Sequence, residues 1–436
     1  MNIIIILKRN NELRHFENII KVFLNKKSKI TILRYALDEK SQGFKAYLSI
    51  KNLNFKNKKI KKKIRFINFY NKAEISNYLK KENDIDFVLG IDFINPRLFN
   101  IDSEFIKKMK KKWCVISTGI DTYANSQYSL NKNIINHYPI FFSYSKEIHK
   151  TGMNYIKKND KKSNYLLNGR SKIIHLGNVQ YNIQKKDNKR NSLVYLPFPY
   201  LRSRFKNRDF AFQASFAGNG INFFDHYYNR LKLGLITSLF NYVKEKFFLK
   251  YQNLKSINKS LNYQNEYKVI KGIRKFCDRN NLLFVVKSRN KFPINSSLYK
   301  ICDQIIEDDG SQQMPSKIQA VLEKSKIVVG YSSLTVLEST LHRIPFINLE
   351  FPNNFFQDKN TKLFYNYKKN NLFNFDGVVF SYSISDFIKK IPNHSIDDFI
   401  SNNDKYNKYL SIFSGIKKKK PADILYGKLL KMKKKK

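Results

Sequence analysis

Short apolar runs alternate with helix-like segments along most of the chain, and this alternation constrains the fold more than any other feature. Residues 3–7 are four isoleucines and a leucine, and residues 12–24 then carry apolar side chains at helical spacing. Similar apolar runs follow at 29–33, 64–69, 86–91, 113–117, 139–144 and 173–176. Continuous apolar strands between helices are typical of a parallel sheet buried on both faces. Residues 1–183 are therefore predicted to form a Rossmann-like domain.

A second series of the same kind follows a short charged stretch at residues 184–191, which is the predicted linker. Strand-like runs alternate with helical patterns again at 193–196, 266–278, 282–287, 304–307, 317–324, 327–330, 334–342 and 345–349. A chain of 436 residues is long enough for two domains. We predict an α/β protein with two doubly wound domains that face a cleft. The second domain covers 192–415, and a basic C-terminal helix and tail covers 416–436.

The formal charge of +48 does not by itself indicate a nucleic-acid-binding protein. Lysine is abundant together with Asn, Ile, Phe and Tyr, whereas the 436 residues include 15 Gly, 10 Pro and 1 Trp. This joint bias is typical of an A/T-rich genome, so nucleic acid is not the partner we expect. A basic surface still attracts phosphates, nucleotides or an anionic membrane.

The cysteines and the apolar segments favour a cytoplasmic protein. Cys114, Cys277 and Cys302 are far apart and lack metal-ligand spacing, so we expect no metal site. The first two lie in apolar patterns and are interpreted as core thiols in a reducing compartment. We find no apolar stretch of 18 residues, and we interpret residues 3–7 as a buried strand rather than a signal peptide.

Residues 327–347 are the most informative segment for function. A buried strand ends at the small residue Gly330, and after Tyr331 the hydroxyl residues Ser332 and Ser333 open a helix whose first turn includes Thr335. Either serine can serve as N-cap, and the helix start would offer backbone N–H groups to a phosphate. Glu338 lies about one and a half turns further on, where a carboxylate can accept ribose hydroxyls. An ordinary capped helix with a surface glutamate is an equally good interpretation.

Two other strand ends carry candidate site residues. Lys287 and Arg289 end the strand 282–287, where two cations can hold a diphosphate and stabilise the charge of a leaving group. A basic loop in a lysine-rich chain is the competing interpretation. In the first domain, Asp121 follows the strand 113–117 and is the nearest candidate acid/base group for an acceptor hydroxyl. A capping aspartate in a turn is at least as good an account.

The segment around Ser332 resembles the nucleotide-binding segment of GT-B proteins that make cell-surface polymers. In CDP-glycerol glycerophosphotransferases an Asp-Tyr-Ser-Ser stretch precedes an acid that stands seven residues before a proline. Tyr331, Ser332 and Ser333 match this stretch, Glu338 stands seven residues before Pro345, and Gly330 replaces the Asp. UDP-GlcNAc 2-epimerases have a similar segment with a Ser-Gly-Gly turn.

Three further segments agree with the resemblance in order. Gly177 and Asn178 match a Gly-Asn-Pro turn near the end of the first GT-B domain, and the strand 193–196 runs into Pro197 as the second domain opens in relatives. Gly119 matches a His-Gly pair in which Thr118 replaces the His. The resemblance implies a metal-independent glycosyltransferase without a permanently bound cofactor. Its donor would be a nucleotide-sugar or a CDP-polyol, and its acceptor a hydroxyl of a surface polysaccharide or lipid-linked glycan.

Several alternatives stay open at this stage. A nucleotide-sugar 2-epimerase, a catalytically inactive relative and a polyanion-binding protein all fit parts of the pattern. The lysine runs at 417–420 and 433–436 would hold the protein at the inner face of the plasma membrane, or they form a solvated tail. His175 is interpreted as a core residue of an apolar strand, and His342 as a cation that ends a helix.

Overall fold

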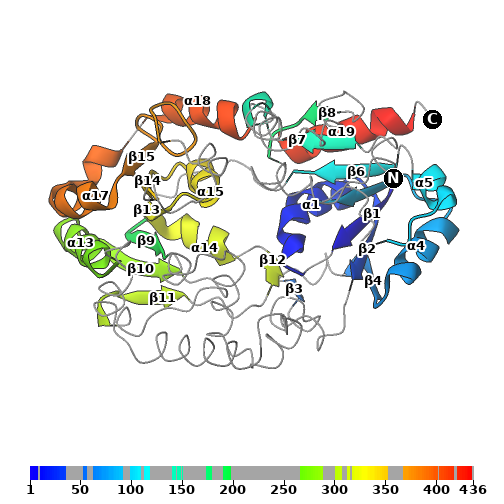
Figure 1. Cartoon of the computed structure of the whole chain (residues 1–436), viewed down its shortest axis with the longest axis horizontal. Coiled ribbons are helices and arrows are strands. Elements are labelled where there is room, and N and C mark those ends of the chain that lie inside the picture. Colours follow the sequence, from blue (N-terminus) through cyan, green and yellow to red (C-terminus); the bar gives the residue numbers. More distant parts are fainter. Residues whose placement is uncertain are drawn as a thin grey trace, which may run out of the picture.

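The computed structural model contains two large parallel sheets and the helices that cover them (Figure 1). The residues that it describes are 1–7, 10–35, 53–55, 62–91, 99–109, 112–117, 140–143, 145–148, 150, 173–178, 190–197, 266–287, 300–306, 312–314, 317–351, 367–400, 402–416 and 420–434. Most of the expected linker at 184–191 lies outside these residues, so its position stays a prediction.

The first sheet has seven parallel strands in the order β4-β2-β1-β5-β6-β7-β8. The isoleucine run forms the central strand β1, with Ile3 and Ile5 in the core on one face and Ile4 and Ile6 in the core on the other. Burial on both faces explains why an unbroken β-branched run suits this position. The strands are β1 (Asn2–Leu7), β2 (Lys29–Tyr35), β4 (Ile64–Phe69), β5 (Phe87–Gly90), β6 (Trp113–Ile116), β7 (Ile140–Ser143) and β8 (Ile173–His175).

The second sheet has six parallel strands in the order β11-β10-β9-β13-β14-β15. In both sheets the chain starts in the middle, adds strands on one side and then continues on the other, which is the Rossmann-like order. The prediction of two doubly wound α/β domains is therefore confirmed. The strands are β9 (Ser192–Leu196), β10 (Leu283–Lys287), β11 (Gln304–Ile306), β13 (Ser325–Tyr331), β14 (Phe346–Leu349) and β15 (Val379–Tyr382).

The helices of the first domain are η1 (Asn10–Phe16), α1 (Glu17–Asn25), α4 (Lys72–Lys81) and α5 (Ser103–Met109). The single helix expected over residues 12–24 is wrong at its start, because η1 is a 3-10 segment. Leu13 and Phe16 are three residues apart and both buried, and the three-residue turn of a 3-10 helix places such a pair on one face. Asn71 caps α4 by accepting a hydrogen bond from the Glu74 N–H.

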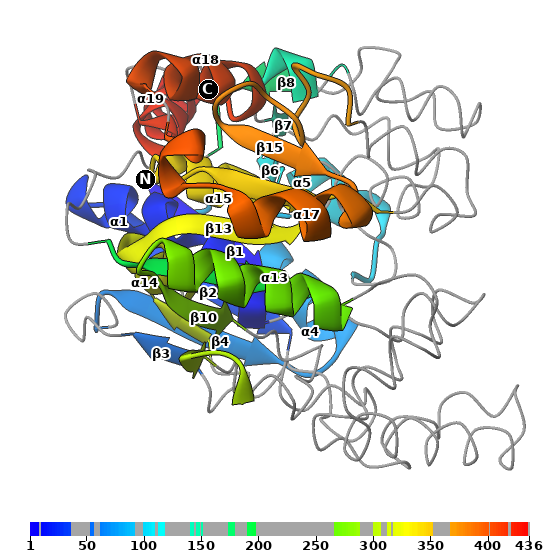
Figure 2. The same ribbon diagram turned by 90° about the vertical axis from the view of Figure 1, so that its left-hand side faces the viewer.

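The helices of the second domain lie on both faces of its sheet. α13 (Glu266–Arg279) and α17 (Ile384–Lys390) cover the outer face, whereas α14 (Lys317–Lys324) and α15 (Thr335–Leu341) cover the face towards the first domain (Figures 1 and 2). The 3-10 turns η7 (Ile391–Asn393) and η8 (Ile396–Phe399) follow α17. Val269, Ile270 and Ile273 of α13 are completely buried, which fixes this helix on the sheet.

The last two helices belong to different domains. α18 (Asn403–Phe413) packs against α15 in the second domain, and α19 (Pro421–Lys433) packs against α1 in the first (Figure 1). Leu425 and Leu429 of α19 are fully buried in the core of the first domain. The basic C-terminal segment expected at 416–436 therefore contains a helix that is part of the first domain's core.

The two chain segments that cross between the domains touch each other. The Asn178 N–H, which follows β8, donates to the Ser414 carbonyl, which follows α18, at 2.7 Å. Gly177 and Gly415 have φ values of 91° and 66°, in the region that favours glycine. The outgoing and the returning crossing therefore form one compact junction.

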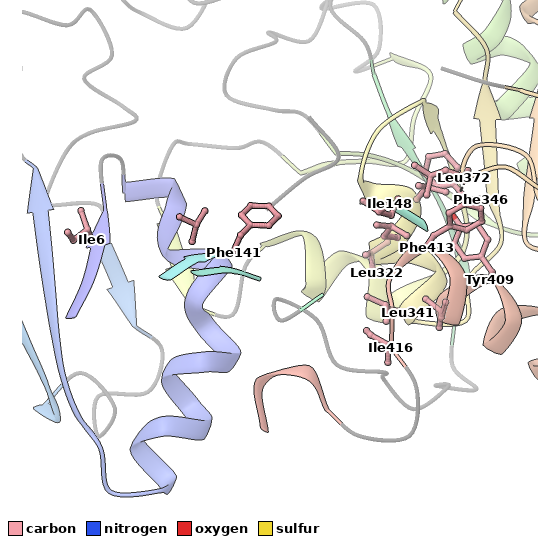
Figure 3. Close-up of a cluster of buried hydrophobic side chains, with 14 of the residues drawn as sticks. Ile6, Phe141, Ile148, Leu322, Leu341, Phe346, Leu372, Tyr409, Phe413 and Ile416 are labelled. Atoms are coloured by element: carbon pink, nitrogen blue, oxygen red, sulfur yellow. Dashed lines mark hydrogen bonds between the residues drawn. The ribbon is translucent and has the colours of Figure 1, made fainter. Parts of the chain in front are cut away.

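Two further features connect the domains. β3 (Leu53–Phe55) and β12 (Gln312–Met314) form a parallel pair, although β3 lies between first-domain strands in the chain and β12 between second-domain elements. One cluster of buried side chains also draws members from both domains, among them Ile6 and Phe141 from the first and Leu341 and Phe346 from the second (Figure 3).

Candidate functional site

The strand order of the second sheet reverses between β9 and β13, and this reversal defines where a ligand of such a sheet binds. Leu196, the last residue of β9, pairs with Gly330 near the end of β13. Tyr331, Ser332 and Ser333 follow, so the segment singled out in the sequence lies at the carboxyl edge beside the reversal. The segment therefore lies where an open α/β sheet can bind a ligand.

Ser332 has a different role from the predicted helix cap. Its side chain is 7% exposed, and its hydroxyl is hydrogen-bonded to Asn348 Oδ1 at 3.0 Å and to the Tyr367 hydroxyl at 3.1 Å. The N-cap of α15 is Leu334, and no side chain caps the helix. The expectation that Ser332 or Ser333 caps this helix is therefore wrong, because a turn over residues 332–334 separates the serines from the first helical residue.

A buried polar network extends from Ser332 across the end of the sheet. Asn348 on β14 is completely buried, and its amide donates to Ser381 Oγ on β15 at 2.9 Å. The Tyr367 hydroxyl also accepts from the Phe351 N–H at 3.0 Å. Buried polar groups that are paired in this way hold loops rigidly. Sequence reasoning missed Asn348, although a polar residue inside the apolar strand 345–349 was a usable signal.

Ser333, Thr335 and Glu338 surround the start of α15. Thr335 is buried, whereas Ser333 and Glu338 are partly exposed. The Glu338 N–H donates to the Leu334 carbonyl at 3.4 Å, so the first turn of the helix is formed. α15 has only seven residues, which makes its own dipole a small contribution to any site.

Lys287 ends β10, the strand next to β9 on the side away from β13. Only 6% of this residue is exposed, so it is a buried cation at the same sheet edge. A buried ammonium group interacts more strongly with an anion than a solvated one does, because the local dielectric is lower. Arg289, which was predicted to act with Lys287, lies outside the described residues.

Glu350 is a further carboxylate at this edge that sequence analysis did not single out. It follows β14 directly, and its N–H donates to the Tyr382 carbonyl at 2.9 Å. Burial raises the pKa of Glu350, while a hydrogen bond from Ser381 opposes the shift. An acid immediately after a buried strand at the carboxyl edge was the signal that could have identified it.

Gly330 stands where the resembling segment of CDP-glycerol glycerophosphotransferases has an aspartate, and its surroundings leave little room for a side chain. A Cβ at this position would lie 3.2 Å from Leu196 Cβ and 3.4 Å from Phe346 Cζ. Side chains larger than hydrogen therefore crowd the contact between β13 and β9.

In the first domain, the predicted acid/base group Asp121 lies outside the described residues. His175 is described, and the expectation that it is a core residue is wrong, because its side chain is exposed at the end of the edge strand β8. Its Nδ1 lies 2.5 Å from Ser143 Oγ on β7. β8 has three residues and pairs only with β7 in the described sheet, so His175 at its end remains exposed.

His342 is also different from its predicted role. It is 4% exposed, and burial, together with the charge of Arg190, lowers its pKa to about 4. The ring is therefore neutral at pH 7 and does not act as a cation at the end of α15. The C-cap position is correct, but the site is too apolar for a charged imidazole.

The interpretation of Cys114 and Cys277 as core thiols is confirmed. Cys114 and Cys277 are fully buried, and burial raises the pKa of the Cys277 thiol to about 12. Among the described residues there is no group of three or more metal-ligating side chains. Within the same ranges, none of the helices is long and apolar enough to span a bilayer.

Comparisons with known proteins find similar structures but no related sequence. No protein-family profile matches the chain, and no curated protein is similar in sequence. The chain is similar in structure to Arabidopsis thaliana UGT89C1 complexed with UDP-L-rhamnose, with 9% identity, 98% coverage of each chain and a TM-score of 0.45. It is also similar to UDP-GlcNAc 2-epimerase from Methanocaldococcus jannaschii, with 13% identity, 99% and 100% coverage and a TM-score of 0.42.

A third similar structure is Acinetobacter baumannii MurG, with 7% identity, 99% coverage of each chain and a TM-score of 0.40. At these identities and TM-scores the similarities say nothing about substrate or reaction. The fold class rests on the strand orders themselves, which define two Rossmann-like domains.

Proposed function

We propose that this protein transfers a sugar, or a polyol phosphate, from a nucleotide-activated donor to an acceptor hydroxyl. The reversal of strand order between β9 and β13 carries the proposal, since ligands of open α/β sheets bind beside the carboxyl ends at such a point. Ser333 follows β13 there, and the buried cation of Lys287 ends β10 on the other side of β9. A cation at this edge suits the diphosphate of a nucleotide donor.

Each remaining residue has a proposed role in holding the donor. Lys287 and Arg289 would neutralise the diphosphate without a metal, and Glu338 would accept hydrogen bonds from the ribose. Ser332 would act through the rigid network with Asn348 rather than by direct contact with phosphate. Glu350 offers a second carboxylate at the same edge.

The ribose role of Glu338 predicts a loss of nucleotide affinity in the variant Glu338→Ala. Hydrogen bonds to a carboxylate contribute about 1.5–3 kcal/mol each, so we expect nucleotide binding to weaken about tenfold or more. Calorimetric titration with UDP, CDP, GDP and CMP measures the change and identifies the preferred base. Glu323→Ala on α14 is the matched control, because Glu323 is an exposed glutamate on a neighbouring helix and its removal should leave affinity unchanged.

Two results would contradict the proposed function. If the unmodified protein binds none of the four nucleotides, the proposal of a nucleotide-donor site is wrong. Interconversion of UDP-GlcNAc and its 2-epimer without any acceptor would instead favour the epimerase, which has the same architecture. Equal affinity of the unmodified protein and Glu338→Ala leaves the transferase standing and transfers the ribose role to another carboxylate, with Glu350→Ala as the next variant.

We further propose that the acceptor is a surface polysaccharide or a lipid-linked glycan and that the protein works at the cytoplasmic face of the membrane. The lysine runs at 417–420 and 433–436 support this proposal. Lys433 forms an ion pair with Asp86 at 2.8 Å, which partly neutralises its charge. We therefore expect the run 417–420 to contribute more to membrane binding than the run 433–436. Each lysine near an anionic surface contributes about 1 kcal/mol.

Neutralising 417–420 to glutamine should therefore abolish sedimentation with phosphatidylserine vesicles at low salt. The matched control removes four lysines from exposed positions of the second domain and should retain most of the binding: Lys268, Lys271, Lys275 and Lys326. Equal losses in both variants would mean that net charge attracts the protein to the vesicles and that the C-terminal run has no special role. Added salt should weaken the interaction, because screening shortens its range.

A further inference from the structure

A row of polar side chains lies along the carboxyl edge of the first sheet. Ser117 follows β6, Ser143 ends β7 and His175 ends β8. Ser143 and His175 are direct partners in the register of β7 and β8, and the Ser117 N–H donates to the Phe142 carbonyl at 3.0 Å. Partner residues of neighbouring strands project to the same face, so Ser143 and His175 stand side by side.

One ring nitrogen of His175 is held by a buried group. Nδ1 lies 2.5 Å from Ser143 Oγ, and Ser143 is 1% exposed. The Leu176 N–H donates to the Ser143 carbonyl at 3.1 Å, which fixes the backbone on both sides of the contact. The imidazole is therefore oriented by the core of the domain while its exposed part faces outward.

The electrostatic surroundings keep this ring neutral. Partial burial and the positive charge of Lys146, in the helical segment after β7, lower the pKa of His175 below its usual range. A neutral imidazole that donates its Nδ1 proton to Ser143 Oγ carries a lone pair on Nε2. Such a ring can accept a proton at neutral pH, whereas a protonated ring cannot.

The same part of the first domain lies close to the second domain. Phe141 on β7 and Ile148 in the helical segment after it belong to the buried cluster that includes Leu372 and Phe413 of the second domain (Figure 3). An acid/base group on the end of β7 or β8 is thus placed next to the domain junction. The Asn178 N–H, three residues after His175, donates to the Ser414 carbonyl at 2.7 Å, so the end of β8 lies at this junction.

We propose that His175 is the general base of the transfer reaction and that Ser143 is its positioning residue, an inference that rests on the proposed function. Nε2 takes the proton of the acceptor hydroxyl as its oxygen attacks the transferred group. The new bond forms between that oxygen and the group, and the bond from the group to the nucleotide phosphate breaks. The nucleotide leaves with the electron pair, and the proton on Nε2 later passes to solvent.

The test compares four full-length proteins: the unmodified chain, His175→Gln, Ser143→Ala and His394→Gln. His394 is the matched control, because its Nδ1 is bonded in the same way to Asp398 at 2.7 Å but lies on the second domain after η7. The assay follows nucleotide release, with water or glycerol as acceptor, from UDP-glucose, UDP-N-acetylglucosamine, GDP-mannose and CDP-glycerol. Nucleotide binding is measured separately by the shift in Tm that UDP, GDP and CDP produce.

We expect His175→Gln to lower nucleotide release about 100-fold or more, the range typical of a lost general base, with an unchanged nucleotide-induced shift in Tm. The fall in rate that the unmodified protein shows at low pH should disappear in this variant. Ser143→Ala should lower kcat without changing the donor KM, since it only orients the ring. His394→Gln should match the unmodified protein.

The outcomes separate this inference from the proposed function. Full nucleotide release by His175→Gln, with donor binding intact, overturns the role of His175 and leaves the transferase in place. A parallel loss of nucleotide binding and release in His175→Gln means that the residue supports the structure, and this also overturns the inference. If the unmodified protein neither binds nor releases any nucleotide, the proposed function and the inference fail together.

Discussion

Replacing Gly177 with alanine is expected to destabilise the junction between the domains strongly. Its φ of +91° is a conformation that residues with a side chain rarely adopt, and holding one there costs about 1–3 kcal/mol. A Cβ would also lie 2.9 Å from the Gly415 carbonyl oxygen and 3.0 Å from Pro421 Cγ. Backbone on both sides cannot yield easily, because the Asn178 N–H is bonded to the Ser414 carbonyl at 2.7 Å.

The urea midpoint of unfolding measures this effect, and Gly427→Ala on α19 is its matched control. Gly427 is also a glycine of the C-terminal region, but a Cβ there has no atom within 4 Å. Alanine is better than glycine in a helix by roughly 0.5–1 kcal/mol, so the control should be slightly stabilised. Equal and small effects of both substitutions would show that the two crossing segments do not form a rigid junction.

Both sheets could be predicted from the sequence because their strands are buried on two faces. A central strand of a parallel sheet must be apolar at every position, so runs such as 3–7 and 327–330 stand out against the lysine-rich background. The three-residue strands β3 and β12 lack this signal. The pairing of β3 with β12 depends on the arrangement of the two domains, which local patterns do not contain.

The candidate site could be located from the sequence but its internal chemistry could not. The position of Ser332 and Ser333 at the carboxyl edge follows from the strand–helix pattern alone. The partner of Ser332 is Asn348, sixteen residues away on another strand, and only the pairing of β13 with β14 brings them together. A hydroxyl with such a partner acts within the network rather than as a helix cap.

The burial of His175 and His342 could not be predicted from the sequence. His175 lies in an apolar run and was expected in the core, but it ends the outermost strand and is exposed. His342 was expected to be a cation at a helix end, but Arg190 and the second-domain core surround it and keep it neutral. Burial of a single residue depends on neighbours distant in the chain, so the local pattern predicted each of them incorrectly.

The return of α19 to the first domain leads to the second large expected effect, for the variant Leu425→Ala. Leu425 is completely buried among side chains of the first domain's core, although more than 400 residues separate it from Ile19 and Phe23 in the same cluster. Truncating a buried leucine to alanine costs about 2–5 kcal/mol, because apolar contacts are lost and a cavity remains. The contact between the Phe23 ring of α1 and the Tyr426 ring of α19, whose centroids are 5.3 Å apart, is not removed by this substitution.

Leu430→Ala is the control for this variant, since Leu430 lies on the same helix but is only partly buried. The change in helix propensity is identical in both variants, so a larger fall in the urea midpoint for Leu425→Ala measures docking of α19 on the first domain. Limited proteolysis should at the same time release the C-terminal segment faster from Leu425→Ala than from Leu430→Ala. Equal midpoints and equal cleavage rates would mean that packing of α19 does not contribute to the stability of the first domain.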